Sequence, residues 1–517
     1  MVNPWIYNKS LEDIEGYIQS NLTINQKKKV ETGEVFTPFH LIQDMLDILP
    51  KTIWKQPDYK WLDPGCGMGN FSMLVFYYLD KGLSSWETNV AKRREHILKN
   101  MLYMIELSPL NVEKVNYIFG EKCNIYKGDA LQTNIWMDKF KQNDFHVIMG
   151  NPPYNTNGMR GKGRKDQGIS TLWPKFVDLS LKVMKRNGFC LLFTPNSWTE
   201  LKSPLSKRIM EHQIVYLRNF DCPSAYKIFD KKAGSMPLCY YLIKNTKPTK
   251  STKVYDSVMD EYVDFYIHKH KFIPNKNISL VSKVLSKATK NIASYYHFTP
   301  PKVKKDTSKF FNTFAKSHPY PLINYVHKRI YITYSTLPSI MQNGRPKLVF
   351  PNYSMGYPIL DKDGILDVGG RASYVLFVED DSIKRLRKIQ EFFVTNLALT
   401  LINSLKTAQK FLSTRTFDLF PDVSQWDMNK INDEVLSTYY DLSKDELNMI
   451  ERQIKEGEGN LSETRRKEII SFSLSDFVSN ETIEYIKKKV KEQPTINTTH
   501  RRGRNKKNQT RKKKLQE

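Results

Sequence analysis

The residues best suited to carry out chemistry lie in Phe145–Asn155, which reads FHVIMGNPPYN. An apolar strand here runs into Pro152 and Pro153, which fix φ, donate no backbone hydrogen bonds and stiffen the loop. The side-chain oxygen of Asn151 and the carbonyl of Pro152 can then accept hydrogen bonds from an exocyclic amine. Such bonds pull the amine nitrogen towards sp³ geometry and free its lone pair, while Tyr154 offers a flat face for a base. The alternative is an ordinary proline turn that closes a strand.

A glycine-rich loop, Asp63–Phe71 (DPGCGMGNF), lies between the apolar Trp61–Leu62 and an expected helix at Ser72–Leu79. The loop contains three glycines, Gly65, Gly67 and Gly69. Glycine lets the backbone turn tightly after a strand and approach a ligand closely. The loop begins with an acid, lacks the Lys-Ser/Thr pair of a phosphate-binding loop and departs from the GxGxxG pattern. A nucleoside without phosphates therefore fits it best, although tight turns that bind nothing also need glycine.

Two further acids follow later strands. Tyr103–Glu106 (YMIE) places the Glu106 carboxylate where it can accept hydrogen bonds from ribose hydroxyls. Lys127–Leu131 (KGDAL) offers Asp129 to an adenine amino group. A single Asp after a strand is usually a helix cap. With Asp63, however, three acids at the carboxyl ends of successive parallel strands favour a nucleoside cofactor site.

The elements that must position these residues follow an α/β pattern over residues 31–245, where short β-rich runs alternate with amphipathic stretches. The expected strands are Trp61–Leu62, Leu102–Ile105, Asn124–Tyr126, Phe145–Met149, Phe189–Phe193, Ile214–Phe220 and Leu238–Ile243. We therefore expect an α/β fold with a doubly wound sheet, preceded by a helical lead-in at residues 1–30.

The rest of the chain differs in composition. Asn245–Lys253 is polar and contains proline, so residues 246–299 are predicted to be a linker or connecting segment. Residues 300–425 are rich in Tyr, Pro and β-branched residues and are predicted to be a mixed α+β domain. Its expected elements are the strands Lys347–Met355, Gly364–Val368 and Ser373–Val378 and the helix Ile383–Leu412. Residues 426–495 should be a charged helical region, and residues 496–517 a disordered basic tail.

The chain of 517 residues carries 80 Lys and Arg against 54 Asp and Glu, a formal net charge of +26. The segment His500–Glu517 contributes +8 of this, and the other residues keep +18. Such a charge indicates a polyanionic partner, most often nucleic acid. No apolar run approaches the ~20 residues that cross a bilayer, and Met1–Ser10 does not resemble a signal peptide. Five cysteines without CxxC pairs indicate a reducing, intracellular compartment, so we expect no membrane association and no metal site.

In their order along residues 31–245, these motifs resemble the amino-group (N6-adenine) DNA methyltransferases that use S-adenosylmethionine, in the gamma arrangement found in type II restriction-modification enzymes. The resemblance implies a Rossmann-like methyltransferase sheet. It assigns binding of the methionine part of the cofactor to Thr37 and Pro38, within Thr32–Pro38 (TGEVFTP). It assigns the rest of the cofactor site to Asp63, Gly65, Gly67, Gly69, Glu106 and Asp129, and catalysis to Asn151, Pro152, Pro153 and Tyr154. Phe229, in Ile228–Ala233 (IFDKKA), would form a sandwich with Tyr154 around an extruded base.

Two segments depart from the plain pattern. Asp63 and Glu106 are 43 residues apart, where a βαβ step takes about 30. The surplus lies in Lys81–Lys99, which has the pattern of an inserted amphipathic helix. Asn155–Asp166 is basic and rich in glycine, and it is either a lid over the substrate or a solvated loop.

The resemblance implies direct methyl transfer from S-adenosylmethionine to the N6 amino group of adenine in double-stranded DNA, with the base flipped out of the stack. Double-stranded DNA is the expected partner, and a cognate restriction endonuclease is a further one. Sequence choice would come from residues 300–425, where basic and aromatic residues interleave. The candidates are Lys302–Lys305, Lys328–Arg329, Gly344–Lys347, Tyr353, Tyr357, Arg371, Lys406, Lys410 and Arg415. Each of them taken singly is more often a solvated surface residue.

Three alternatives are open. The same chemistry can act on RNA adenine or on a protein glutamine, but those enzymes are generally shorter and need no large basic C-terminal domain. A fused nuclease is disfavoured, because no PD…(D/E)xK arrangement is found and 30 residues before the first motif are too few for one. A catalytically inactive DNA-binding module would have lost Asn151 or the cofactor glycines, and both are intact. The expected location is the cytoplasm of a bacterial or phage-infected cell, or the cytoplasm or nucleus of a eukaryotic host cell for a viral enzyme.

Overall fold

The computed structural model describes residues 4–24, 37–132, 135–155, 171–201, 203–229, 236–270, 272–287, 296–299, 310–326, 330–338, 342–351, 358–368, 375–405, 420–456 and 462–492. The chain divides into two compact units, the first comprising Met1–Lys283 and Ser404–Gln409, and the second Val284–Asn403 and Lys410–Glu517. Within the described ranges, no helix is long and apolar enough to cross a membrane. The same ranges contain no group of three or more His, Cys, Asp or Glu side chains that could hold a metal ion.

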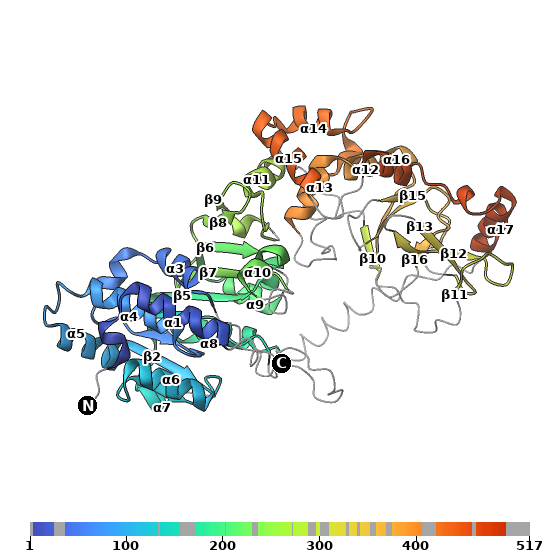
Figure 1. Ribbon diagram of the computed structural model, residues 1–517. Helices are drawn as coiled ribbons and strands as arrows, with labels where there is room; N and C mark the ends of the chain where they lie inside the picture. The colour runs from blue at the N-terminus through green and yellow to red at the C-terminus, as the bar shows by residue number, and fades with distance from the viewer. Residues whose placement is uncertain are drawn as a thin grey trace, which may run out of the picture. The chain divides into compact units, whose positions relative to one another are not determined.

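The first unit is built on a nine-stranded sheet with the strand order β3-β2-β1-β4-β5-β7-β6-β8-β9 (Figure 1). The strands are β1 (Trp61–Asp63), β2 (Leu102–Glu106), β3 (Asn124–Lys127), β4 (Phe145–Gly150), β5 (Met184–Pro195), β6 (Gln213–Phe220), β7 (Leu238–Lys244), β8 (Thr252–Asp256) and β9 (Glu261–Phe265). The first five pair in parallel, and β7 runs antiparallel between β5 and β6. Every strand that the sequence predicted in this unit is present, and the α/β class with a large, mostly parallel sheet is confirmed.

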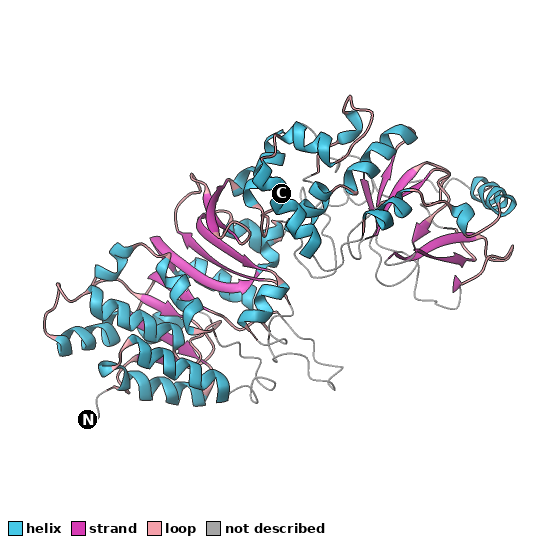
Figure 2. Cartoon of the chain, turned by 45° about the horizontal axis from the view of Figure 1, so that its top comes forward, coloured by secondary structure: helices cyan, strands magenta, loops and turns pink. Residues whose placement is uncertain are grey.

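Helices lie on both faces of the sheet (Figure 2). They are α1 (Leu11–Ile24), α3 (Phe39–Asp47), α4 (Asn70–Gly82), α5 (Val90–His96), α6 (Pro109–Phe119), α7 (Ile135–Phe140), α8 (Trp173–Val183), α9 (Pro204–Ile209) and α10 (Cys222–Ile228), and α11 (Ile278–Lys287) follows β9. Helices α1, α3 and α6 pack with α4, whereas α7 and α9 pack with α8. Because both faces are covered, the central strands are apolar along most of their length and buried, as in other parallel sheets.

An inserted helix accounts for the long step between β1 and β2, as the sequence predicted. Helix α5 lies within this step and leads into a π-helical turn at Ile97–Met101. Arg93 and Arg94 of α5 each place their Nε 2.8 Å from a carboxylate oxygen of Asp80 on α4. These ion pairs hold the inserted helix on α4. The insertion therefore does not displace β2, which still ends beside β1.

The sheet continues past residue 245, where the sequence predicted a linker. Strand β8 pairs in parallel with β6, and β9 pairs antiparallel with β8. Asp256, at the end of β8, is fully buried and accepts hydrogen bonds from the backbone N–H groups of Asn277 (3.0 Å) and Ile278 (2.6 Å), where α11 begins. The polar composition of Asn245–Lys253 therefore reflects the connection between β7 and β8 and the start of an outer strand rather than a domain linker.

The second unit contains two four-stranded sheets, ordered β10-β17-β14-β15 and β11-β13-β12-β16. The strands are β10 (Tyr296–Thr299), β11 (Phe310–Phe311), β12 (Tyr320–Val326), β13 (Ile330–Ser335), β14 (Lys347–Pro351), β15 (Ile359–Asp361), β16 (Asp367–Val368) and β17 (Val375–Glu379). The helices are α12 (Ile383–Phe393), α13 (Asn396–Ser404), α14 (Asp433–Tyr440), α15 (Lys444–Glu456), α16 (Glu463–Ile470) and α17 (Asn480–Lys491). The charged helical region predicted after residue 426 is thus present.

The single helix predicted at Ile383–Leu412 is wrong in its described part, since the chain forms α12 and α13 with a break at Val394 and Thr395. The Asp433 carboxylate accepts hydrogen bonds from the backbone N–H groups of Asn396 and Leu397, each at 3.1 Å. Thr395 Oγ1 also accepts a hydrogen bond from the Ala398 N–H at 3.2 Å, so a local N-cap and a tertiary contact together cap the second helix start. The threonine is a signal in the sequence, whereas the contact with Asp433 is not. Residues 406–412 lie outside the described ranges.

Lys347 was one of the candidates for contacting nucleic acid, and for this residue the prediction is wrong. Its side chain is 0% exposed, and its Nζ lies 2.9 Å from Oδ2 of Asp361, which is 3% exposed. The two residues are direct partners across β14 and β15. Asp361 also accepts hydrogen bonds from the backbone N–H groups of Ile365 (3.3 Å) and Leu366 (2.7 Å), so the pair holds the hairpin turn inside the fold.

We expect Lys347→Ala to lower the free energy of unfolding by about 3–5 kcal/mol, because it leaves the Asp361 carboxylate buried without its cation. Urea unfolding followed by circular dichroism measures the loss. Lys455→Ala is the matched control, since this lysine is 77% exposed in its pair with Glu451 and should change stability by no more than about 0.5 kcal/mol. Equal losses in the two variants would contradict the role given to the buried pair.

Candidate active site

The site predicted from the sequence lies where two neighbouring parallel strands end. Trp61 and Leu62 of β1 pair with Val147 and Ile148 of β4, so Asp63 and Gly150 end their strands side by side. The next strand after β1 in the chain, β2, lies on the other side of β1. The strand order therefore reverses between β1 and β4, and ligands of open α/β sheets bind in the crevice at such a point.

Asp63 is buried at the end of β1, with 1% of its surface exposed. Burial raises the pKa of Asp63 to about 8; the nearby Glu106 carboxylate also raises it, and a hydrogen bond from the Gly65 N–H at 3.3 Å lowers it. Gly150 makes room for this carboxyl, because a Cβ on Gly150 would lie 2.8 Å from Asp63 Oδ1. The φ of Gly150 is 144°, which side-chain-bearing residues rarely adopt.

The glycine loop is held against the end of β2. The Gly67 N–H donates to Glu106 Oε2 at 2.8 Å, and the Ser108 N–H donates to Glu106 Oε1 at 2.7 Å. Gly67 and Gly69 have φ of 55° and 85°, and Gly69 is the N-cap of α4. A Cβ on Gly67 would meet nothing within 4 Å, so the space over the loop is open to a ligand.

Asp129, the third predicted acid, lies on the exposed loop after β3. Its Oδ1 accepts a hydrogen bond from the Leu131 N–H at 2.9 Å, and the neighbouring Gly128 N–H donates to the Glu106 carbonyl at 2.9 Å. The loop after β3 is thus bound to the end of β2. This bond to the N–H two residues on forms an Asx turn and not a helix cap, because the next helix, α7, begins only at Ile135. Binding of an adenine amino group by Asp129 stays a prediction.

The predicted catalytic loop lies beside the predicted cofactor loop. A Cβ added to Gly65 would lie 3.5 Å from Cδ of Pro153, so a single methyl group would fill the space between the two loops. The Asn151 Nδ2 donates to Thr37 Oγ1 at 3.0 Å, and Thr37 is 3% exposed. The sequence predicted the two residues separately, one for the cofactor and one for catalysis, and the structure brings them together.

Tyr154 is 8% exposed and lies on the wall of a pocket of about 690 Å³. The other lining residues include Trp173, Asn196, Trp198, Leu205, Arg208 and Pro237. The Tyr154 hydroxyl makes no hydrogen bond with any described residue, and burial, with a smaller effect of Cys239, raises its pKa. Tyr154 therefore contributes its ring rather than a charge to this pocket.

Most of this pocket wall was not predicted from the sequence. Asn196–Trp198 directly follow β5, the strand after the catalytic loop, so they end at the same edge of the sheet as Asp63 and Asn151. A polar Pro-Asn-Ser-Trp run after an apolar strand was the available signal. Arg208 could not be found this way, because it lies on α9, where its guanidinium binds Asp178 of α8 with two hydrogen bonds of 2.7 and 2.8 Å.

Phe229 is buried at the end of α10, and its ring packs against Phe193 with the centroids 5.4 Å apart. Its sandwich with Tyr154 around an extruded base stays a prediction. The rest of its motif, residues 230–233, lies outside the described ranges, as do residues 32–36 and 156–166.

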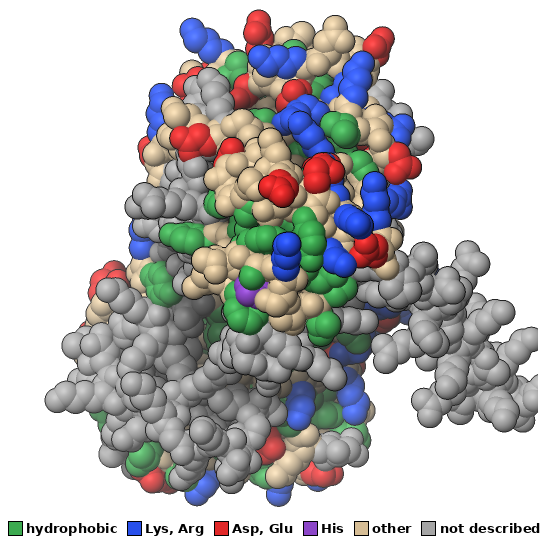
Figure 3. Space-filling view, turned by 90° about the vertical axis from the view of Figure 1, so that its right-hand side faces the viewer, with side chains coloured by type: hydrophobic (Ala, Val, Ile, Leu, Met, Phe, Trp, Pro, Cys, Tyr) green, Lys and Arg blue, Asp and Glu red, His purple; other side chains and the backbone are tan. Residues whose placement is uncertain are grey.

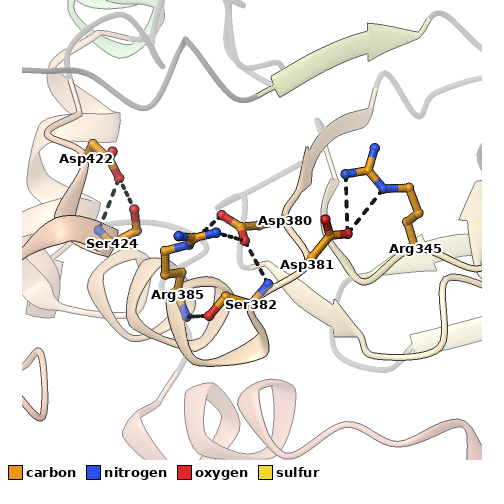
Figure 4. Close-up of polar contacts among 7 residues, drawn as sticks. All are labelled: Arg345, Asp380, Asp381, Ser382, Arg385, Asp422 and Ser424. Carbon is orange, nitrogen blue, oxygen red and sulfur yellow. Dashed lines mark hydrogen bonds and ion pairs between the residues drawn. The ribbon is translucent and has the colours of Figure 1, made fainter.

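Most candidates for sequence recognition in residues 300–425 also lie outside the described ranges. They are Lys302–Lys305, Lys328–Arg329, Tyr353, Tyr357, Arg371, Lys406, Lys410 and Arg415. Arg345 is described, and it is half-exposed and faces Asp381 at 3.4 Å, beside the Asp380–Arg385 pair that begins α12 (Figure 4). The face shown in Figure 3 mixes Lys and Arg with Asp, Glu and apolar side chains, without one continuous basic stripe among the coloured residues.

Residues 81–229 match a family model described as Eco57I restriction-modification methylase. A curated protein of Mycoplasma pneumoniae, described as an uncharacterized adenine-specific methylase, is 22% identical over 48% of this chain and 79% of its own length. Among solved structures, a methyltransferase subunit of a type I restriction-modification system from Streptococcus thermophilus is 14% identical, covers 50% of this chain and has a TM-score of 0.34. The type IIG restriction endonuclease BpuSI is 10% identical, covers 93% of this chain and 67% of its own, and has a TM-score of 0.40. The chain spans 56% of the length of the type I subunit. The family model and the curated relative confirm the predicted resemblance to restriction-modification methyltransferases.

We expect Gly150→Ala to weaken cofactor binding at least about 10-fold and to cost about 1–3 kcal/mol of stability, because the new Cβ displaces the Asp63 carboxyl and requires a strained φ. Titration calorimetry with S-adenosylmethionine and urea unfolding measure the two effects. Gly16→Ala is the control, since Gly16 lies on α1 with nothing within 4 Å of an added Cβ. That variant should be up to about 1 kcal/mol more stable, and unchanged cofactor affinity in Gly150→Ala would refute the assignment.

The raised pKa of Asp63 predicts a pH dependence of stability. Its folded pKa of about 8 lies above the ordinary value of 3.8, so between pH 4 and 8 the folded chain binds more protons than the unfolded chain. The contribution of Asp63 to stability is therefore complete below pH 4 and is lost as pH rises to 8. The free energy of unfolding, measured across this range, should decline in the wild type and stay level in Asp63→Asn. The control variant Asp58→Asn, changed at an exposed position, should decline as the wild type does.

Proposed function

We propose that this chain is an S-adenosylmethionine-dependent DNA methyltransferase that transfers a methyl group to the N6 amino group of adenine within a specific sequence of duplex DNA. The observation that carries the proposal is the position of the Asn151–Tyr154 loop beside the glycine loop, at the reversal of strand order. This position brings two acceptors for an amine next to a site for a nucleoside cofactor.

The residues at the strand ends fit S-adenosylmethionine. The cofactor supplies a methyl group on a sulfonium, which is a good leaving centre, together with ribose hydroxyls and an adenine ring. The Glu106 carboxylate can accept hydrogen bonds from the ribose hydroxyls. The neighbouring Leu107, 69% exposed, offers an apolar surface. The open space over Gly67 lets the backbone approach the cofactor. A cationic ligand also favours the charged form of the buried Asp63 carboxyl.

Catalysis by this chain consists of positioning and polarisation. The Asn151 Oδ1 and the Pro152 carbonyl accept the two N–H groups of the target amine and localise its lone pair on nitrogen. The nitrogen then attacks the methyl carbon in line, the carbon–sulfur bond breaks, and the excess proton on nitrogen leaves to solvent. No covalent intermediate with the protein is needed, and holding the two reactants in this geometry accounts for most of the rate.

The target adenine must leave the duplex to reach Asn151. The pocket of about 690 Å³ beside Tyr154 has room for one base and is lined by Trp173 and Trp198. Stacking on an aromatic ring is worth roughly 1–3 kcal/mol per base, which offsets the few kcal/mol needed to extrude it. The pocket and the tyrosine ring therefore support base flipping.

Duplex DNA is the partner that agrees with the net charge of +26. We assign sequence recognition to residues 300–425 in the second unit, and salt-dependent, sequence-independent affinity to residues 496–517. A restriction endonuclease of the same specificity is the cellular partner that this function implies. An enzyme of this kind protects DNA from that nuclease.

The decisive experiment incubates the full chain with S-adenosylmethionine labelled on the methyl group and with duplex DNA, and maps the modified bases by sequencing. We expect N6-methyladenine within one sequence context. Labelling confined to cytosine, to RNA or to protein would refute the proposal.

We expect Asn151→Ala to reduce methyl transfer by about 10²–10³-fold or more and to leave S-adenosylmethionine binding within 2-fold of the wild type. Asn151 contacts the amine and not the cofactor, so rate and cofactor affinity should separate. Single-turnover rates and titration calorimetry measure the two quantities. Asn143→Ala, at an exposed position of the same unit, is the control and should keep both; full activity of Asn151→Ala would show that the catalytic assignment is wrong.

A further inference from the structure

We infer that the pocket beside Tyr154 binds a whole nucleotide, with Arg208 at its rim as the ligand of the phosphodiester group next to the extruded base. The inference rests on the proposed function, because it names the part of the DNA that this pocket would hold. Arg208 lines the pocket, and among the described residues of the pocket wall it is the one with a charged side chain.

The pocket is aromatic in its buried part and polar at its rim. The rings of Tyr154, Trp173 and Trp198 line it and are buried. The exposed lining residues are Thr171, Ser197, Pro204 and Arg208. A nucleotide has a matching polarity, with a flat base at one end and an anionic phosphodiester at the other. A nucleotide whose base lies on the buried rings therefore presents its phosphodiester to the rim.

The volume of the pocket agrees with a ligand larger than a base. At about 690 Å³, the pocket lies within the range of roughly 300–1,000 Å³ that accommodates drug-sized ligands. An adenine ring is smaller than such a ligand. Space therefore remains beside the base for the sugar and the phosphate of the same nucleotide.

The guanidinium of Arg208 is oriented by a neighbouring helix and keeps donors available. Its Nε and Nη2 donate to the two carboxylate oxygens of Asp178 on α8, at 2.7 and 2.8 Å. A guanidinium has five N–H donors, so three remain, and no described residue accepts a hydrogen bond from them. These donors lie on Nη1 and Nη2, whose spacing matches two oxygens of a phosphate.

Asp178 prepares Arg208 for an anion without placing a carboxylate in the pocket. Asp178 is not among the residues that line it. A guanidinium that is already held in one orientation loses less side-chain entropy when it binds a phosphate. The carboxylate therefore favours binding of a phosphate by restricting the guanidinium, although it offsets part of the positive charge.

An ion pair that only joined α8 to α9 would predict a different outcome. The side chains of Arg208 and Asp178 are 44% and 39% exposed, and pairs with such exposure contribute little to stability. A purely structural Arg208 would also leave the protein equally sensitive to the charge of any one phosphate. A phosphate ligand makes that sensitivity depend on Arg208.

The test combines a protein variant with a change in the DNA. Duplexes with the methylated sequence carry a neutral methylphosphonate in place of the phosphate on the 5′ or the 3′ side of the target adenine. Binding is measured by fluorescence anisotropy in the presence of S-adenosylhomocysteine. We expect one of the two methylphosphonates to weaken binding to the wild type by about 10-fold, because charge-assisted hydrogen bonds to that phosphate are lost. Arg208→Gln should weaken binding of the unmodified duplex by a similar factor.

The two losses should not add, because each removes the same contact. Arg208→Gln should bind that methylphosphonate duplex and the unmodified duplex equally, within about 2-fold. Lys207→Gln, at a neighbouring exposed position that does not line the pocket, is the matched control and should respond as the wild type does. Additive losses, or a wild type that binds both methylphosphonate duplexes as tightly as the unmodified one, would overturn the inference. If Arg208→Gln does not fold, the response of the wild type to the two methylphosphonates decides.

A second measurement needs neither turnover nor a known recognition sequence. Deoxyadenosine 3′,5′-bisphosphate and deoxyadenosine are titrated into the full chain by nuclear magnetic resonance, with the cofactor site saturated by S-adenosylhomocysteine. The wild type should bind the bisphosphate about 10-fold more tightly, and Arg208→Gln should bind the two probes equally. Equal binding by the wild type, or an unchanged preference in Arg208→Gln, would overturn the inference. If the wild type methylates no DNA, the proposed function fails, while this preference still decides whether Arg208 binds a phosphate.

Discussion

The candidate site depends on the parallel pairing of β1 with β4 in the middle of the first sheet. This pairing places Asp63, at the end of β1, beside Gly150, the last residue before the Asn-Pro-Pro-Tyr motif. Because parallel strands end at the same edge, the two loops that follow must lie next to each other. Everything else in the candidate site is arranged around this edge: the glycine loop closes against β2, the Asn-Pro-Pro-Tyr loop lies beside Gly65, and the pocket extends from Tyr154 towards the end of β5.

Close packing at this edge forces specific residue types. A carboxyl as buried as Asp63 leaves no room for a side chain at position 150, so the neighbouring strand requires this glycine as much as its own φ of 144° does. Several polar groups there are satisfied by neighbours far away in the sequence, as in the bonds from Gly67 to Glu106 and from Asn151 to Thr37. An unpaired buried polar group costs about 1–3 kcal/mol. These bonds therefore stabilise the site before any ligand is present.

The second unit shows why net charge alone does not locate a DNA-binding surface. Lys347 and Asp361 are entirely used in holding a hairpin, and Arg345 faces Asp381. Lysine and arginine side chains in a basic sequence can thus stabilise the fold instead of binding a polyanion. Removing one partner of an ion pair that is buried with additional hydrogen bonds strongly destabilises the protein. The charge available to a polyanion is smaller than the composition suggests, and its location depends on which carboxylates the fold brings near.

The amino-acid sequence by itself determined the α/β class, seven of the nine strands of the first unit's sheet, and the glycine loop and the Asn-Pro-Pro-Tyr loop that follow two of them. It could do so because strand periodicity, glycine turns and the diproline are local: each depends on residues within about one element. The boundary at residue 245, the burial of Lys347, the place of Arg208 in the pocket wall, and the bond from Asn151 to Thr37 were decided by the tertiary structure alone. Each of these features joins residues between 14 and 114 positions apart, and only the packing of the chain determines which distant residues meet.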